Sequence, residues 1–291
     1  MKTLSFLMAD LRRADLHMHS TASDGALKPS ELMRKAYEAG LRCVALTDHD
    51  TISGLAEAKK AAKALGLDFI SGVEISASVG EEEVHLLGYG FDPADERLSA
   101  HFTRLQEQRV ERARHMVRKL QEAGVGITYD AVAEAAGGGA VGRPHVAAAL
   151  IGAGVVADHH EAFQRFLSDG EIGFVPKPPF PASEALEALH RAAGVGVLAH
   201  PGHWTASHVL MSLIRDGLDG IEVVHPSHDE MLQNYYRRIA AQYDLLTTGG
   251  SDFHRESEKG RTRLGRHTIP YSYVDRLLTR LRQRRNAVHS D

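Results

Sequence analysis

Two histidines one residue apart, His17 and His19, are the first residues whose types and spacing suit chemistry. Side chains of a β-strand alternate between its two faces, so a strand here would aim both imidazoles into one space. Asp24 follows closely and adds a carboxylate. Imidazoles and carboxylates held together are ligands for divalent cations. An isolated His-x-His pair is weak evidence for a metal site, because core and chance histidines also produce it. The later segments of the chain decide whether this pair belongs to such a site.

The later apolar segments carry the same residue types within them or at their C-terminal ends. Seven apolar runs are present, and six of them contain or end in such a residue. The run at residues 219–224 supplies none of the predicted ligands, but the loop after it contains His225 and His228. Because the carboxyl ends of parallel strands meet on one face of a βα fold, these scattered side chains are expected to converge. The predicted ligands are His17, His19, Asp24, His49, Glu74, His85, His200, Asp252 and His254.

This mixture of imidazoles and carboxylates, without thiolates, suits Mn²⁺, Fe²⁺ or Zn²⁺. Nine groups are too many for one ion, so we expect two or three ions. Any one of these residues alone is more simply a hydrogen-bonded polar group, but nine at strand ends need a common reason. Clustered divalent ions give a metal-bound hydroxide from water and clamp the oxygens of a phosphoryl centre. That chemistry favours hydrolysis of a phosphate ester and leaves amide hydrolysis open.

The elements that would position these ligands alternate between strand and helix. Lys28-Pro29-Ser30-Glu31 has the proline and acidic residue typical of a helix start, and glycines 40 and 66 end two helical segments. The alternation predicts an α/β fold with a parallel sheet. It is interrupted by four helical segments and a proline-rich connector. We predict a discontinuous barrel domain, residues 13–95 and 182–291, and a helical insertion, residues 96–181, that decorates or caps the site.

Composition argues against several other classes of protein. The 291 residues are 43% hydrophobic and 25% charged, and the net charge of -4 gives no basic field for nucleic acid or membrane. No segment approaches the length of a transmembrane helix, and residues 1–9 lack the pattern of a signal peptide. The single cysteine, Cys43, is expected to be buried filler and suits a reducing, cytoplasmic location. The arginines of residues 276–285 are expected to face solvent rather than RNA.

The ligands fall in short motifs, which are His17-x-His19, Ser23-Asp24-Gly25, Thr47-Asp48-His49, Gly72-Val73-Glu74, Val84-His85, Ala199-His200-Pro201 and Ser251-Asp252-Phe253-His254. In this order they resemble the motifs of the PHP (polymerase and histidinol phosphatase) family. The match covers about residues 13–95 and 183–270. The resemblance implies a distorted (β/α)7 barrel with a di- or trinuclear metal centre. No motif position is missing, which argues against a non-catalytic member.

The resemblance also implies how the ligands divide among the ions. One ion would be held by His17, His19, Glu74 and Asp252. Glu74 would bridge to a second ion held by His85 and His200. The third ion would be held by Asp24, His49 and His254.

The insertion resembles that of stand-alone PHP phosphoesterases related to nucleoside 3',5'-bisphosphate phosphatases and 5'-3' exoribonucleases. Those carry an Arg-x-His-like element, which here is Arg143-Pro144-His145. Arg143 is therefore a candidate phosphate clamp, since a guanidinium grips phosphate through a fork of donors; an exposed, ion-paired arginine is the alternative. His228 resembles a substrate-facing position that could bind phosphate or act as the acid. The candidate substrate-binding residues are Arg143, His145, Lys177 and His225.

One position departs from the nucleotide-cleaving relatives, which carry Gly-Lys before an aromatic-Val pair. Here the corresponding residues are Gly170-Glu171 and Phe174-Val175, and Lys177 comes later. An acidic residue where a phosphate-seeking lysine is expected departs from the pattern for nucleotide specificity. Lys177 is the residue that would replace that lysine.

Three functions from different classes compete. A metal-dependent phosphoesterase would act on a phosphorylated small molecule or nucleotide, including an RNA 5' end or histidinol phosphate, with no membrane or protein partner expected. An amidohydrolase-type C–N hydrolase would use a carboxylated lysine, but no lysine stands at a strand end. An accessory, polymerase-associated module is disfavoured because every ligand is present and no polymerase motif follows. The sequence favours the phosphoesterase.

Overall fold

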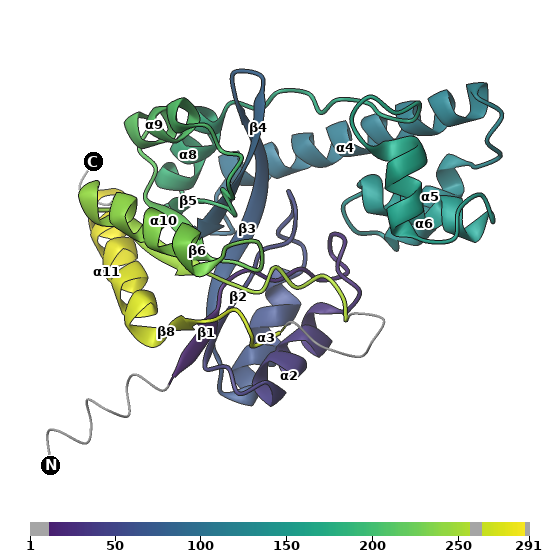
Figure 1. The fold of residues 1–291 in the computed structure, drawn as a ribbon. Helices are drawn as coiled ribbons and strands as arrows, with labels where there is room; N and C mark the ends of the chain where they lie inside the picture. The colour runs from purple at the N-terminus through teal and green to yellow at the C-terminus, as the bar shows by residue number, and fades with distance from the viewer. Residues whose placement is uncertain (1–11, 257–263, 289–291) are drawn as a thin grey trace, which may run out of the picture.

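The computed structural model describes residues 12–256 and 264–288, and its centre is an eight-stranded sheet (Figure 1). The strand order is β7-β6-β5-β4-β3-β2-β1-β8. The strands are β1 (Arg13–Asp15), β2 (Cys43–Leu46), β3 (Asp68–Val79), β4 (Glu82–Tyr89), β5 (Val195–Leu198), β6 (Gly220–Val224), β7 (Leu246–Gly249) and β8 (Ile269–Pro270). Helices alternate with the parallel strands, so the predicted α/β fold with a barrel-shaped sheet is confirmed.

The two sides of the sheet meet, and this contact nearly closes the barrel. The backbone N of Leu16 donates to the carbonyl of Gly249 at 3.1 Å, and that of His19 donates to Phe253 at 2.9 Å. The approach is closest at Gly250, where an added Cβ would lie 2.4 Å from the backbone N of His17. Only glycine allows such an approach. Since β1 ends at Asp15, both histidines lie on an extended segment held by these bonds rather than within a regular strand.

β4 runs antiparallel to both of its neighbours, and β8 runs antiparallel to β1, whereas the sequence predicted a parallel sheet. β3 continues past Glu74 to Val79 and turns at Gly80, where φ is +60°, into β4. The parallel prediction is wrong here because a tight hairpin can join only antiparallel strands. The reversal matters for function, since His85 lies opposite Ser76 and is brought to the mouth where the other strands end.

Six helices of the described chain pack around the barrel: α2 (Pro29–Glu38), α3 (Leu55–Leu65), α8 (Ala182–Arg191), α9 (Ser207–Arg215), α10 (Glu230–Gln242) and α11 (Tyr271–Val288). The expected helix signals are present. The backbone N of Lys28 donates to the Glu31 carboxylate at 3.2 Å, and Gly66 ends α3 in a left-handed conformation, φ +71°. The buried face of α2, which includes Leu32 and Ala36, packs into the larger apolar core between helices and sheet.

A second apolar core fills the barrel and joins it to α11. It includes Leu16, Leu87 and Val197 of the barrel and Leu277 and Leu281 of α11. The hydroxyl of Tyr89 on β4 donates to the carbonyl of Leu16 at 2.8 Å, although the two segments are not neighbours in the sheet. That bond therefore crosses the barrel interior. α11 packs against one end of the barrel. The predicted ligands lie at the other end, the mouth.

Between β4 and α8 the chain forms a set of helices that projects from the barrel (Figure 1). They are α4 (Glu96–Glu122), α5 (Tyr129–Ala136), α6 (Arg143–Gly152), α7 (His159–Ala162) and a π-helical turn (Phe163–Leu167). Asp95 caps α4 by accepting from the backbone N of Leu98, and Thr128 caps α5 in the same way. A separate apolar core forms here around Leu120, Val146 and Leu150. The boundaries of the insertion at 96 and 181 stay a prediction.

The projecting helices contact two loops of the barrel mouth. The backbone N of Ala140 donates to the carbonyl of Ala22 at 2.9 Å, in the loop that carries Asp24. Arg109 on α4 donates to the carboxylate of Asp50 at 2.6 Å, directly after His49. These helices therefore brace the loops around the site and are more than decoration.

Two further expectations concern the ends and surface of the chain. Two C-terminal arginines, Arg280 and Arg284, are ion-paired with the buried Asp219, so the expectation that they face solvent is wrong: they dock α11. Cys43 is buried in β2, as expected. None of the described helices combines the length and apolarity that a membrane crossing requires. The expectation for residues 1–9 lies outside the described residues.

Candidate metal centre

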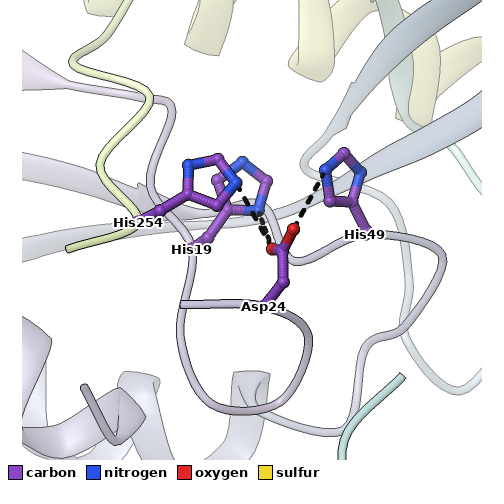
Figure 2. Close-up of side chains that lie close together, drawn as sticks. All are labelled: His19, Asp24, His49 and His254. Atoms are coloured by element: carbon purple, nitrogen blue, oxygen red, sulfur yellow. Dashed lines mark ion pairs between the residues drawn. The ribbon is translucent and has the colours of Figure 1, made fainter. Parts of the chain in front are cut away.

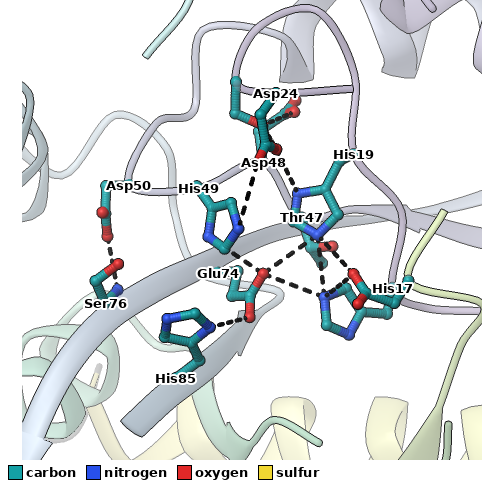
Figure 3. Close-up of polar contacts among 12 residues, drawn as sticks. His17, His19, Asp24, Thr47, Asp48, His49, Asp50, Glu74, Ser76 and His85 are labelled. Carbon is teal, nitrogen blue, oxygen red and sulfur yellow. Dashed lines mark hydrogen bonds and ion pairs between the residues drawn. The ribbon is translucent and has the colours of Figure 1, made fainter. Parts of the chain in front are cut away.

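The nine predicted ligands meet at one mouth of the barrel. Figures 2 and 3 label all of them except His200 and Asp252. They come from the segment after β1, from β3 and β4, and from the turns after β2, β5 and β7. Three residues in these turns have left-handed backbone: Asp50 (φ +52°), His200 (φ +25°) and Asp252 (φ +48°). Such conformations are uncommon outside glycine and cost about 1–3 kcal/mol each. The fold therefore retains strained turns where they direct side chains over the mouth.

Four donor atoms from His17, His19, Glu74 and Asp252 surround one point. The two Nε2 atoms are 3.1 Å apart, and each is 3.2 Å from Oε2 of Glu74. Oδ1 of Asp252 lies 3.3 Å from the first nitrogen and 3.2 Å from the second. A regular tetrahedron with ligand bonds of about 2.0–2.1 Å has edges of about 3.3–3.4 Å. The donor atoms are therefore spaced as ligands of one cation would be.

The other oxygen of Glu74 faces a second pair of imidazoles. Oε1 is 2.7 Å from Nδ1 of His85 and 2.9 Å from Nε2 of His200. Nδ1 of His49 lies 3.3 Å from Oε2. Burial alone would raise the pKa of Glu74, but the imidazoles around it, those of His49 and His85 foremost, hold this pKa well below its usual value. A fully ionised, buried carboxylate therefore stands between two groups of ring nitrogens.

Asp24 is the centre of the third group (Figure 2). Its Oδ1 is 3.3 Å from Nε2 of His254 and 3.8 Å from Nδ1 of His19, and its Oδ2 is 3.9 Å from Nε2 of His49. The rings of His19 and His254 stack with centroids 4.1 Å apart. His19 therefore faces Asp24 with one nitrogen and Glu74 with the other. The resemblance to the PHP family had assigned His19 to one ion only.

The side chains of this cluster fit divalent cations. Nδ1 of His19 and Nδ1 of His49 are buried and lack a hydrogen-bond partner. A buried polar atom without a partner costs about 1–3 kcal/mol, and a cation would satisfy both nitrogens. The donor set consists of imidazoles and carboxylates, which Zn²⁺, Fe²⁺ and Mn²⁺ accept.

Glu222 is a functional candidate that sequence reasoning missed. It lies fully buried on β6, and its carboxylate oxygens are 3.0 and 3.2 Å from Nδ1 of His17. It also accepts from the backbone N of His200 at 2.8 Å. A carboxylate on one imidazole nitrogen fixes the tautomer, so Nε2 of His17 is left to face the centre. The available signal was an acidic residue inside an otherwise apolar strand.

Asp48 supports the loop that carries Asp24. It accepts from the backbone N and the hydroxyl of Ser20, each at 2.7 Å, and from the hydroxyl of Ser23 at 2.6 Å. The sequence marked Asp48 only as part of a motif. In the structure the Asp48 side chain positions this loop, since these bonds set the conformation of the chain between Ser20 and Asp24.

His225 and His228 differ in what their rings can do. His228 lies with Nδ1 2.9 Å from the Val223 carbonyl, and its Nε2 accepts from the backbone N of Gly202 at 3.0 Å. Both nitrogens are thus engaged by the backbone, which counts against a role as the acid in this conformation. His225 lies within the cluster, because its Nε2 is 3.3 Å from Asp252 and its ring centroid is 5.2 Å from that of His200.

The other three candidate substrate residues lie in the insertion and the connector. His145 accepts from the backbone N of Gly142 at 3.0 Å and also bonds the backbone of Ser23, so it braces the mouth. Arg143 lies 3.5 Å from Asp169 and within 6.0 Å of two phenylalanine rings. Lys177 pairs with Glu83, and its Nζ is 3.4 Å from Nε2 of His85. Of the three, Lys177 reaches a predicted ligand.

Comparison with known proteins adds independent findings. The sequence model of the PHP domain matches residues 15–170. A 5'-3' exoribonuclease of Haemophilus influenzae is 36% identical over 84% of this chain and 90% of that protein. A 3',5'-nucleoside bisphosphate phosphatase of Chromobacterium violaceum is 38% identical over 85% of this chain and 89% of that protein.

The fold also matches a solved structure. The crystal structure of a suggested metal-dependent phosphoesterase from Bifidobacterium adolescentis superposes with a TM-score of 0.85 at 34% identity. The superposition covers 93% of this chain and 96% of the other. The similarity therefore extends over the barrel and the projecting helices together.

Proposed function

This chain belongs to the PHP domain family and is a metal-dependent phosphoric ester hydrolase, and we propose that its substrate is a phosphorylated nucleotide. The observation that carries the proposal is the placement of Glu74. Its two oxygens face separate groups of imidazoles from four segments of the chain. A carboxylate so placed is suited to bridge two cations, and two cations can clamp the attacking and leaving oxygens when a phosphate ester is hydrolysed.

We propose that two or three ions of Mn²⁺, Fe²⁺ or Zn²⁺ are held at this mouth. The proposed ligands are His17, His19, Asp24, His49, Glu74, His85, His200, Asp252 and His254. Bound ions supply Lewis acidity for the phosphoryl oxygens and lower the pKa of water. The chain's own contribution is to hold the donor atoms in place: Glu222 orients His17, and Asp48 fixes the loop of Asp24.

The substrate phosphate is proposed to meet Lys177 and His225 at the edge of the cluster. Lys177 lies beside His85, and His225 contacts Asp252, so both reach atoms next to the proposed ions. Lys177 would then serve in place of the lysine that nucleotide-cleaving relatives carry near position 171. Arg143 is proposed to bind a more distant anionic group, and His145 to position the loop of Asp24.

The nucleotide assignment rests on the relatives. The Haemophilus influenzae relative is named a 5'-3' exoribonuclease, and the Chromobacterium violaceum relative is named a 3',5'-nucleoside bisphosphate phosphatase. This chain covers about nine-tenths of each. A nucleoside 3',5'-bisphosphate and the 5' end of RNA are the two substrates proposed. Histidinol phosphate stays an alternative within the same reaction class. A cytoplasmic location stays a prediction from the single cysteine.

The test is a phosphate-release screen on the purified, Mn²⁺-loaded protein, after elemental analysis of the protein as isolated. The panel contains nucleoside 3',5'-bisphosphates, 5'-phosphorylated short RNA, cyclic phosphates and histidinol phosphate. Release from a bisphosphate or an RNA end, and its loss in Asp24→Asn, is the expected result. Preferential release from histidinol phosphate would select the alternative, and silence across the panel would overturn the proposal.

A further inference from the structure

A cavity of about 450 Å³ lies beside the candidate metal centre. Its walls are the β3–β4 hairpin, helix α4 and the connector of residues 174–180, which runs back toward α8 (Figure 1). The cavity continues to the centre through Ser76 and Lys177, which adjoin Glu74 and His85. Its size is that of a small-molecule site. A substrate bound at the ions therefore has room to extend into it.

Three cations line this cavity, and two of them are neutralised. Arg109 pairs with Asp50 at 2.6 Å, and Lys177 pairs with Glu83. Arg112 differs. It is 8% exposed, and its Nε donates to the carbonyl of Val175 at 2.7 Å. Within the part of the chain that the structure describes, no carboxylate lies within ion-pair distance of its guanidinium.

Charges of both signs surround Arg112, since the carboxylates of Glu83 and Asp169, which also line the cavity, raise its pKa less than Arg143 and Arg109 lower it. Burial, and then the guanidinium groups of Arg143 and Arg109, lower the pKa of Arg112 to about 10. The group is still protonated at neutral pH. A buried charge without a counter-charge is strongly unfavourable, and an anion placed beside it removes that penalty. Arg112 is therefore a binding group that lacks its partner.

The rest of the wall suits a flat ring. Phe174, Phe180, Pro176 and Leu105 line the cavity. The guanidinium of Arg143 lies 6.0 Å from the ring of Phe174, so a second fork of donors stands near Arg112. Apolar walls with a few placed polar groups are the usual composition of a nucleotide-sized site.

We propose that this cavity is an anion subsite in which Arg112 binds a second phosphate of the substrate while the first is held at the candidate metal centre. The inference deepens the proposed function and rests on it, because a nucleoside 3',5'-bisphosphate carries both phosphates on one sugar. Arg112 is a binding and specificity residue here. Its guanidinium grips phosphate oxygens with the terminal donors that the Val175 bond leaves available.

The test compares Arg112→Met with Arg112→Lys and with the control Arg118→Met, whose arginine is exposed on the same helix. Steady-state rates of the Mn²⁺-loaded enzyme are measured with adenosine 3',5'-bisphosphate and with adenosine 5'-monophosphate. Arg112→Met should lower kcat/KM for the bisphosphate about 10- to 100-fold, mainly through KM. The monophosphate value should change less than about twofold, and Arg118→Met should match the wild type.

A binding measurement separates this inference from the proposed function. Calorimetric titration of metal-free protein with the same two nucleotides needs no turnover. The wild type should prefer the bisphosphate, Arg112→Met should lose that preference, and Arg112→Lys should keep part of it. An unchanged preference in Arg112→Met, or in Arg112→Lys if the first variant does not fold, overturns the subsite. Absence of phosphate release with the preference intact would overturn the proposed function alone.

Discussion

Two clusters of buried ionisable side chains lie at opposite ends of the barrel and are satisfied in different ways. At the end covered by α11, Asp219 is 3% exposed and accepts from His190 at 2.7 Å, from the backbone N of Gly196 at 3.0 Å and from Arg284 at 2.5 Å. At the mouth, Glu74 is 1% exposed and contacts imidazoles, which face one another as well.

The difference shows which cluster is complete. Asp219 has a donor hydrogen for each contact, and its arginine partner is a permanent cation, so that network is a finished structural unit. The mouth holds ring nitrogens 3.1 Å apart and two buried nitrogens without partners. Perturbed ionisable groups occur in both structural networks and functional sites, and the unpaired donor atoms separate the two cases.

The largest expected effect breaks the mouth and leaves the opposite cluster intact. Asp24→Asn keeps the size of the side chain but removes the charge that faces His254, His49 and His19. We expect turnover to fall at least about 1,000-fold, or about 4 kcal/mol of activation free energy, with the fold kept. Phosphate release and circular dichroism measure the two quantities. Elemental analysis should show fewer bound ions per chain.

His200→Ala should behave like Asp24→Asn, because it removes an imidazole from Oε1 of Glu74. Turnover near the wild-type value in either variant, with ions still bound, would show that the ligand set is wrong.

The converse substitution breaks the structural cluster. Asp219→Asn removes the buried charge that holds Arg284 and His190. We expect the free energy of unfolding to fall by about 2–3 kcal/mol, since one partner of a buried ionic network is removed. Urea unfolding at pH 7 measures this loss. Activity below the unfolding transition should stay within about twofold of wild type, and a large loss of activity would contradict the contrast between the two ends.

An intermediate effect is expected one contact away from the mouth. Glu222→Gln keeps the shape of the side chain but replaces the carboxylate that fixes the tautomer of His17. Such changes typically weaken metal affinity or activity about 10- to 100-fold. Titration of metal-free protein with Zn²⁺ under competition by a chelator measures the affinity. Glu230→Gln, at an exposed position on α10, is the control and should not change it.

The smallest effect concerns pH and sharpens the account of Asp219. Burial would raise the pKa of Asp219, but the bond and charge of His190, with Gly196 and Arg284, lower it below its usual value. A carboxyl with a lowered pKa in the folded state stabilises the fold above the unfolded-state pKa of about 4 and loses that contribution as pH falls through the folded-state value.

The stability difference between wild type and Asp219→Asn should therefore shrink as pH falls from 5 toward 3. Urea unfolding at several pH values measures this difference. A difference that widens on acidification would mean that the sign assigned to Asp219 is wrong.

Sequence reasoning found what periodicity and strand ends reveal. The helical segments predicted between the two halves of the barrel are observed, and α5 among them has a Thr cap and a glycine end. The direction of β4 was missed, since an apolar strand has the same alternation in either direction. Glu222 was missed because its partner, His17, is 205 positions away. The engagement of His228 depends on Gly202, a backbone contact that no local pattern encodes.

The contact at Gly250 has a consequence for the order in which the molecule matures. The backbone N of Ser251 donates to Asp15 across 236 positions of sequence, and the same junction brings Asp252 and His254 to the two early histidines. Contacts of such separation carry the largest loop-closure entropy and tend to form late. A chain whose β7 has not yet emerged from the ribosome lacks the side chains of Asp252 and His254 at the mouth. The set of proposed ligands is therefore complete only after the segments around Asp15 and Ser251 have met.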